Sequence, residues 1–372
     1  MIGYNAVQVL VAPQAVADNW LRLQHKGTEM VAVVKADAYG HGLVPVAQAL
    51  ARRGARRFAV GTVAEGVALR EALPGVQIIA LLGIQDASDA AACRDYGIVP
   101  LVTHAGQWPL LRRAAAAADV PLAVILKFDT GMARLGFAWE AVVQVVDALR
   151  AAPMLRPVAV FSHLAAADDP EAADFVAEQT ARLAAVQTSL AAAGFSVPAS
   201  LANSAALVAH PAAHFQMQRP GIALYGANPL AGTAWEDRCP PLIPAMTVTA
   251  PILQVRDIAP GVTVSYGRTF RASRPMRIAI VAAGYADAYS RGLSGKAAMV
   301  VGGVRAPVLG RVCMQMTAVD VTHCPSARPG DRAYLLGGPG EAAITADELA
   351  AWWGTIPYEV LCLLGMNPRS MV

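Results

Sequence analysis

The sequence predicts an α/β protein, an N-terminal (β/α)8 barrel of the TIM type followed by a C-terminal, mostly β domain. Short apolar runs alternate with alanine-rich helical patterns up to about residue 225, and eight such units are present, the number that closes a barrel. After Asn228 and Pro229, short strands recur between Gly and Pro turns with little helix, which is typical of a separate β domain. We therefore expect a barrel over 1–230 and a β-rich domain over 231–372.

The eight barrel strands are expected at regular intervals. They are residues 30–35, 57–60, 77–82, 98–102, 122–128, 157–162, 198–202 and 215–218. Helical stretches separate them, for example Val44–Arg53, Thr62–Leu73, Gly106–Ala118, Trp139–Ala151 and Pro170–Ala193. The spacing alone also allows an open, doubly wound sheet, but the count of eight favours the barrel.

The second domain is expected to consist of short strands, with helix only after Thr345. The strands are Ala250–Val255, Arg277–Val281, Ala297–Val301, Val304–Val308, Thr317–Val321 and Arg332–Leu336.

Composition favours a cytoplasmic enzyme that acts on a small molecule. Of 372 residues, 55% are hydrophobic and 15% charged, with a net charge of +3, which leaves enough apolar side chain for a large core and an interface. Lys and Arg are scattered, so no nucleic-acid partner is expected. The five cysteines lie far apart without a CxxC pair, so neither a disulfide framework nor a metal site is expected. Gly and Pro interrupt the longest stretch without charged residues, Leu183 to Gln218, so no membrane span is expected.

The most specific run is VAVVKADAYGHG, Val31 to Gly42. It places Lys35 where a buried strand leaves the core. An amine that is half-buried there loses solvation, so its pKa falls and it becomes a competent Schiff-base nucleophile. Tyr39 adds a hydroxyl, and Gly40 and Gly42 let backbone approach an anion. These features suit an aldehyde cofactor that carries a phosphate, pyridoxal phosphate, although a lysine by itself is more often a solvated surface residue.

Other polar residues follow the expected strand ends. Lys127 ends the fifth strand, His163 follows the sixth, Asn203 and Ser204 follow the seventh, and Arg219 follows the eighth. In a barrel all of them lie at the C-terminal rim, where active sites are built. Taken alone, His163 could be a core imidazole and Arg219 a solvated cation. Their joint placement at successive strand ends favours a site.

Nine segments along the chain resemble the bacterial alanine racemases, which are pyridoxal-phosphate enzymes. They are VVKADAYGHG (33–42), KFDTGMARLGF (127–137), FSHLA (161–165), NSAA (203–206), RPGIALYG (219–226), VSYGRTF (264–270), GYADAYSR (284–291), GRVCM (310–314) and TIPYE (355–359). The resemblance implies interconversion of L-alanine and D-alanine in a homodimer with shared active sites. The product would serve cell-wall synthesis as a peptidoglycan precursor, or the enzyme would serve alanine catabolism.

The resemblance also assigns roles to residues. It implies that Lys35 and Tyr266 are catalytic bases on opposite faces of the substrate, and that Arg134 and Met314 bind the substrate carboxylate. Lys127 resembles a family lysine that CO2 carbamylates. The cofactor would be bound by Lys35, Tyr39, His163, Asn203, Ser204, Arg219, Gly221, Ile222 and Tyr358.

The chemistry explains these residue types. Racemisation removes a proton from one face of Cα and returns one to the other, so it needs two bases. An arginine at the cofactor ring nitrogen, the role implied for Arg219, cannot give up its proton, so that nitrogen stays unprotonated. The cofactor is then a weaker electron sink, which favours racemisation over side reactions such as transamination and decarboxylation.

The chain departs from the family pattern at three places. Gln315 replaces the usual aspartate at the substrate entrance, Ala288 stands where glycine is common, and the usual acidic N-terminal strand is missing. Gln315 leaves open a racemase of broader amino-acid range. A non-catalytic pyridoxal-phosphate-binding protein would resemble the first domain alone. A decarboxylase of the same fold would carry a carboxylate at the position of Arg219.

Overall fold

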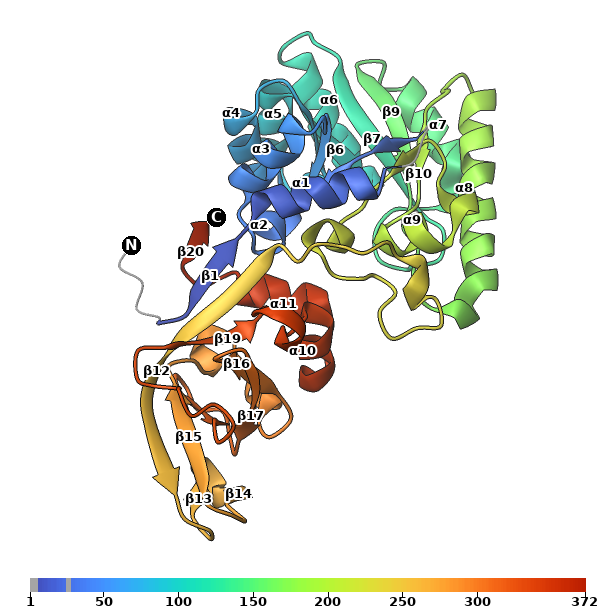
Figure 1. The fold of residues 1–372 in the computed structure, drawn as a ribbon. Helices are drawn as coiled ribbons and strands as arrows, with labels where there is room; N and C mark the ends of the chain where they lie inside the picture. Colours follow the sequence, from blue (N-terminus) through green and yellow to red (C-terminus); the bar gives the residue numbers. More distant parts are fainter. Residues whose placement is uncertain (1–5, 25–27) are drawn as a thin grey trace.

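The barrel predicted from the sequence is confirmed in a computed structural model, which describes residues 6–24 and 28–372. Its strands pair in parallel in the order β2-β11-β10-β9-β7-β6-β5-β4-β3, and β8 pairs with β7. Figure 1 shows the barrel above the second domain. The strands are β2 Glu29–Met30, β3 Ala32–Val33, β4 Arg57–Val60, β5 Gln77–Ala80, β6 Ile98–Val102, β7 Leu122–Asp129, β8 Phe137–Ala138, β9 Leu155–Phe161, β10 Ala199–Ser200 and β11 Met217–Gln218.

The first predicted strand divides into β2 and β3 around Val31, and this division closes the barrel. β2 pairs with β11 and β3 pairs with β4. The N–H of Val31 donates to the carbonyl of Gln218 at 2.8 Å, and the N–H of Val34 donates to the carbonyl of Ala59 at 2.8 Å. The open, doubly wound alternative is therefore wrong.

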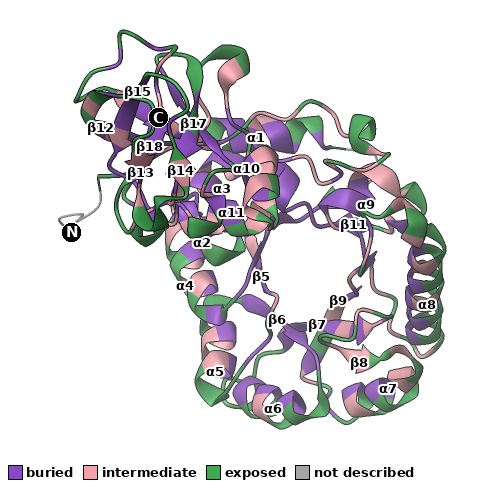
Figure 2. Cartoon of the chain, turned by 90° about the horizontal axis from the view of Figure 1, so that it is seen from below, coloured by how far each residue is buried: buried purple, intermediate pink, exposed green. Residues whose placement is uncertain are grey.

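Helices cover the outside of the barrel, with their exposed faces outward, as Figure 2 shows. The predicted helices are present to within a few residues. Local caps explain some of their limits: Thr62 and Glu65 form a capping box at α4, which satisfies N–H groups that the first helical turn leaves unpaired. The helices are α1 Pro13–Arg22, α2 Lys35–Tyr39, α3 Leu43–Arg52, α4 Val63–Ala72, α5 Ala87–Tyr96, α6 Trp108–Ala116, α7 Val142–Arg150, α8 Ala173–Ala192 and α9 Ser204–Ala209, with the short 3-10 helix η5 at Ile222–Tyr225.

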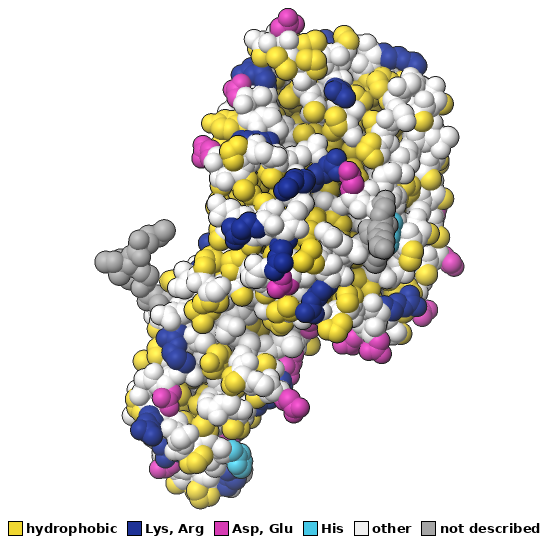
Figure 3. All heavy atoms as spheres, turned by 45° about the horizontal axis from the view of Figure 1, so that its top comes forward, with side chains coloured by type: hydrophobic (Ala, Val, Ile, Leu, Met, Phe, Trp, Pro, Cys, Tyr) yellow, Lys and Arg dark blue, Asp and Glu magenta, His cyan; other side chains and the backbone are white. Residues whose placement is uncertain are grey.

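Bulky side chains from the barrel strands form its core. Phe58, Phe128 and Phe161 are at most 1% exposed, and the burial of each stabilises the fold by roughly 1.5–3 kcal/mol. No helix in the described part of the chain has the length and hydropathy needed to cross a membrane. On the face in Figure 3, basic and acidic side chains are interspersed among apolar ones.

The second domain is a mostly antiparallel sheet with two helices, and all six predicted strands are present in it. The sheet order is β15-β18-β17-β16-β19-β12-β1-β20. The elements are β12 Met246–Ile258, β13 Thr263–Val264, η7 Tyr266–Arg268, β14 Phe270–Arg271, β15 Met276–Val281, β16 Ala298–Val301, β17 Val304–Leu309, β18 Thr317–Asp320, β19 Arg332–Leu336, α10 Ala346–Trp353, α11 Pro357–Leu364 and β20 Arg369–Met371.

One strand of this sheet comes from the beginning of the described chain. β1, Gln8–Val11, pairs antiparallel with β12 and parallel with β20. The chain thus connects the two domains twice, once after β1 and once before β12. The predicted domain boundary near residue 230 falls in the second connection, before β12, and stays a prediction.

Candidate active site

Lys35 lies at the barrel rim, two residues after the end of β3, and begins α2, which is a left-handed turn rather than a regular α-helix. The next four residues, Ala36 to Tyr39, have φ between 52° and 54°, the left-handed region. For residues other than glycine this conformation costs roughly 1–2 kcal/mol each. Burial, followed by the positive charge of Arg134, lowers the pKa of Lys35, although the residue retains solvent access. The position and the lowered pKa of this amine are those expected of a nucleophile, and its role stays a prediction.

Hydrogen bonds within the turn stabilise it. The N–H of Ala38 donates to Val34 at 2.9 Å, and that of Gly42 donates to Asp37 at 2.8 Å. Glu65 of α4 accepts from the N–H of Asp37 at 3.2 Å and from Gly61 at 2.7 Å. Glu65 thus connects the Lys35 turn to the start of the next barrel helix.

Tyr39, Ser204 and Gly221 form a polar cradle at the same rim. The Ser204 hydroxyl accepts from the N–H of Gly221 at 2.8 Å, and a Cβ on Gly221 would lie 2.4 Å from the Tyr39 hydroxyl, so only glycine fits. Ile222 follows as the first residue of η5. The Asn203 side chain caps α9 by accepting from a backbone N–H.

Tyr39 is packed between two other tyrosines. Its ring centroid lies 4.7 Å from that of Tyr225 and 6.0 Å from that of Tyr358. Burial raises the pKa of Tyr39 and the pKa of Tyr358, so both hydroxyls remain protonated donors. Tyr225 donates to the carbonyl of Val33 at 2.9 Å, which ties η5 to the strand before Lys35.

Arg219 is buried behind this cradle, and its guanidinium contacts no carboxylate among the described residues. It donates to the Ser200 hydroxyl and to the Ser162 carbonyl at 2.6 Å, and it stacks on Phe161 at 4.6 Å from the ring centroid. Burial lowers the pKa of Arg219 to about 9, so it stays charged at neutral pH.

His163 lies 3.4 Å from the Arg219 guanidinium, measured from its Nδ1. Burial, followed by the charges of Arg219 and Lys127, lowers the pKa of His163 well below its usual range. The imidazole is therefore neutral and can accept the hydrogen bond. The sequence left open whether His163 is a core imidazole or a site residue. The side chain is largely buried and also belongs to the polar cluster around Arg219.

Lys127 lies near the end of β7, and Arg134 lies in the following loop, which is folded around Asp129, the last residue of that strand. The Asp129 carboxylate accepts from the N–H groups of Gly131 at 2.8 Å and Arg134 at 3.1 Å, which fixes the loop. Burial, followed by the positive charge of Arg219, lowers the pKa of Lys127 to about 7. Arg134 is exposed at the rim.

The site is a cluster of cations that fits an anionic ligand. Arg134 and Arg219 both lower the pKa of Lys35 and that of Lys127, which shows that these positive charges lie close together. Protonated tyrosine hydroxyls, Ser204 and a glycine backbone stand beside them. Phosphate oxygens and a carboxylate match this donor set, so the residues present fit pyridoxal phosphate and an amino acid.

Tyr266 and Met314 are not brought to this site within one chain. Both lie in the second domain, where Tyr266 is 72% and Met314 57% exposed. Tyr266 begins η7 beside β13 and β14, far from the barrel mouth in Figure 1. Tyr285 is also exposed, and its N–H donates to the carbonyl of Cys313, next to Met314, at 3.1 Å.

Sequence reasoning did not assign several residues of the site. Glu65 and Cys362 both raise the pKa of Lys35, against the larger effects of burial and Arg134. His41 is fully buried within the turn, where burial lowers its pKa to about 4. The capping-box spacing of Thr62 and Glu65 is a sequence pattern that could have identified Glu65. No sequence pattern identifies Cys362, because only the packing of α11 brings it near Lys35.

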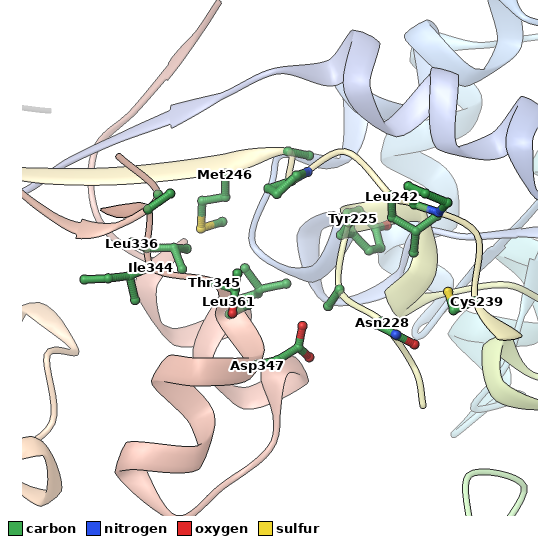
Figure 4. Close-up of a pocket in the computed structure, with 18 of the residues that line it drawn as sticks. Tyr225, Asn228, Cys239, Leu242, Met246, Leu336, Ile344, Thr345, Asp347 and Leu361 are labelled. Atoms are coloured by element: carbon green, nitrogen blue, oxygen red, sulfur yellow. The ribbon is translucent and has the colours of Figure 1, made fainter. Parts of the chain in front are cut away.

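A separate cavity of about 720 Å³ lies where the two domains meet. Figure 4 shows Met246 and Leu336 on one side and Tyr225 and Leu242 on the other, with Asp347 projecting from α10. It contains none of the predicted site residues. Within residues 6–24 and 28–372, no three His, Cys, Asp or Glu side chains gather in a way that could hold a metal ion.

The chain matches known proteins over nearly its full length. The family models "Alanine racemase, N-terminal domain" and "Alanine racemase, C-terminal domain" match residues 11–229 and 245–372. The alanine racemase of Nitratidesulfovibrio vulgaris strain DSM 19637 / Miyazaki F is 57% identical over 371 residues, 99% of each chain.

Solved structures agree with this assignment. The biosynthetic alanine racemase of Pseudomonas aeruginosa has a TM-score of 0.87 at 36% identity and covers 99% of each chain. The alanine racemase of Bartonella henselae, solved with covalently bound pyridoxal phosphate, has a TM-score of 0.87 at 28% identity, over 98% of this chain and 99% of the other. The chain belongs to the alanine racemase family of isomerases.

Proposed function

We propose that this protein interconverts L-alanine and D-alanine with pyridoxal phosphate as cofactor. The observation that carries the proposal is the cluster around Lys35. Lys35, with its lowered pKa, begins the same turn that carries the Tyr39 hydroxyl. Arg219, buried and without a carboxylate partner among the described residues, lies behind them. This is the donor set expected for a phosphate-bearing aldehyde at the rim of a barrel.

The residues that would hold the cofactor surround the cradle. Lys35 would bind its aldehyde, and His163 and Arg219 would contact the ring. The phosphate would be held by Tyr39, Ser204, the backbone of Gly221 and Ile222, and Tyr358. Asn203, at the start of α9, would also contact the cofactor. When bound, pyridoxal phosphate supplies an electron sink that acidifies the Cα–H bond of an amino acid.

Two residues of the chain would move the proton. Lys35 Nζ removes or returns it on one face of Cα, and its lowered pKa favours the unprotonated form that a base requires. Tyr266 Oη acts on the opposite face. Because Tyr266 is exposed on the second domain, it would reach the site of a second copy, which makes the enzyme a homodimer with shared active sites.

Three further residues would tune the reaction. Arg219, charged at neutral pH, keeps the cofactor ring nitrogen unprotonated and limits side reactions. Arg134 and the Met314 backbone N–H would bind the substrate carboxylate, with Met314 supplied by the partner copy. We place this activity in the cytoplasm, where it supplies D-alanine for peptidoglycan or consumes alanine.

The alternatives differ in substrate range. Gln315 is exposed in the loop that carries Met314, and a neutral amide there leaves open a racemase that also accepts other amino acids. Measuring turnover of L-alanine, L-serine and L-lysine distinguishes an alanine-specific racemase from one of broader amino-acid range. A non-catalytic pyridoxal-phosphate-binding protein is disfavoured because the C-terminal family model matches residues 245–372.

Reductive trapping tests the proposal. Borohydride treatment of the loaded protein followed by peptide mapping is expected to place a pyridoxyl group on Lys35, because only a Schiff base is reduced to a stable amine. The Lys35→Ala protein should carry no such group, while Lys296→Ala, a change of a lysine in the second domain, should be labelled like wild type. Labelling of Lys35→Ala to the wild-type extent would contradict the assignment.

A further inference from the structure

An arginine of the second domain contacts both ends of the left-handed turn. Arg369, the first residue of β20, forms an ion pair with the Asp37 carboxylate and donates to the carbonyl of Gly40 at 3.0 Å. Asp37 lies near the beginning of the turn, and Gly40 follows its last residue, Tyr39. One guanidinium nitrogen, Nη1, makes both contacts, and the planar guanidinium holds that nitrogen in a fixed orientation.

The backbone of Arg369 is fixed by the sheet of the second domain. Arg369 pairs with Val9 of β1, and the N–H of Val9 donates to the carbonyl of Pro368 at 3.0 Å. β1 is in turn paired with β12 along its length. The side chain of Arg369 therefore reaches the barrel from a rigid support.

The second oxygen of Asp37 extends the contact into the barrel. It accepts from the N–H of Leu43, at the start of α3, at 2.7 Å. Helix α11 closes the other side, where a Cβ on Gly365 would lie 2.2 Å from the Gly40 carbonyl oxygen. The turn is thus enclosed between α3 of the barrel and β20 and α11 of the second domain.

We propose that Arg369 is a positioning residue that keeps this turn left-handed and so sets where Lys35 and Tyr39 stand. Ala36, Asp37 and their neighbours have a more stable right-handed conformation, so contacts from outside the turn decide its hand. The inference rests on the proposed function only in naming Lys35 and Tyr39 as cofactor residues. The contacts themselves need no cofactor.

Hydrogen exchange of the cofactor-free protein, followed by mass spectrometry, tests the positioning role. Arg369→Gln removes the charge and one of the two contacts, and it is expected to raise exchange in the peptide that covers residues 36–43 by about three- to tenfold. Arg369→Lys keeps the charge but places it on a more flexible side chain without the planar guanidinium, so its exchange is expected between wild type and Arg369→Gln.

Arg305→Gln is the matched control. Arg305 also pairs with a carboxylate, that of Glu348, and donates to the carbonyl of Ala343 at 2.9 Å, but it lies away from the turn. Its loss should leave residues 36–43 at the wild-type rate. Unchanged exchange of this peptide in Arg369→Gln, or a rise of equal size throughout the protein, would overturn the inference.

A cofactor titration separates this inference from the proposed function. Arg369→Gln is expected to bind pyridoxal phosphate about three- to tenfold more weakly than wild type, while Arg305→Gln binds it equally. If wild type binds no pyridoxal phosphate, the proposed function fails and the exchange experiment still decides the role of Arg369. If exchange rises in Arg369→Gln but affinity is unchanged, the link to Lys35 and Tyr39 is overturned.

Discussion

The surroundings of Lys127 bring its pKa close to neutral pH, so the charge of this amine changes with small changes in pH. Burial, followed by the charge of Arg219, brings its pKa to about 7, against about 10.4 for a solvated lysine. Below pH 7 the amine is an ammonium ion that cannot attack CO2. Above pH 7 it is increasingly neutral and nucleophilic. Its carbamylation, which the family resemblance implies, therefore becomes more favourable as the pH rises.

We predict that Lys127 forms a carbamate whose occupancy rises between about pH 6 and pH 8. The measurement is the carbonyl signal of protein-bound carbamate in carbon-13 NMR under labelled bicarbonate. The signal should be absent from Lys127→Ala, which retains every other lysine. A wild-type protein without this signal, or an equal signal in Lys127→Ala, would refute the prediction.

Among single residues, the sequence predicted those site residues that lie at the ends of strands, because the change from apolar to polar side chains marks where a strand ends. Lys35, Lys127, His163 and Arg219 were found in this way. Arg369 was not, because it reaches Gly40 across 329 positions of the chain. No local pattern records a contact of that kind.

Among the elements, the short helix η8, Tyr285–Asp287, ends in a strained residue. Ala288 follows it with φ 62° and ψ 11°, the left-handed conformation that glycine adopts without cost. The sequence comparison had marked Ala288 as standing where glycine is common. The backbone angle gives the physical reason for that preference, and it predicts the effect of restoring glycine.

We predict that Ala288→Gly stabilises the protein by about 1 kcal/mol, because relief of the left-handed strain exceeds the entropy that glycine adds to the unfolded chain. Urea unfolding of both proteins measures the difference. Ala184→Gly, the same change on the exposed face of α8, should instead destabilise by about 1 kcal/mol. A loss of stability in both variants would show that Ala288 is not strained.

Helices and strands with a clear hydrophobic periodicity or a capping motif were predictable from the sequence. Elements that depend on partners far away in the sequence were not. The barrel strands and α4 follow from apolar runs and the capping box at Thr62. The left-handed turn after Lys35 does not, because a run of non-glycine residues, such as Ala and Tyr, rarely adopts positive φ. β1 was missed because its partners, β12 and β20, lie at the other end of the sequence.

For the whole molecule, one chain holds only part of the proposed site. Lys35 lies in the barrel, while Tyr266, Met314 and Ile356 are large side chains more than half exposed on the second domain. The separation between Lys35 and Tyr266 is a property of the fold, which the order of motifs in the sequence could not reveal.

We predict that mixing inactive Lys35→Ala and Tyr266→Phe chains restores about a quarter of wild-type activity. In a shared-site dimer the intact Lys35 of one chain meets the intact Tyr266 of the other, so a mixed dimer has one whole site of two, and random exchange makes about half the dimers mixed. Racemase activity after subunit exchange is the measurement, with exchange shown by a fluorescent label. Exchange without any return of activity would mean that each chain builds its own site.

The pairing of β1 with β20 constrains the order in which the polypeptide can fold during synthesis. Val9 leaves the ribosome long before its partner Arg369, so the first strand waits unpaired while the barrel forms. A contact between residues so distant in sequence closes slowly unless other structure has already brought them together. The pairing of β1 with β12 provides that structure, because it holds the first strand in the sheet on which β20 then pairs.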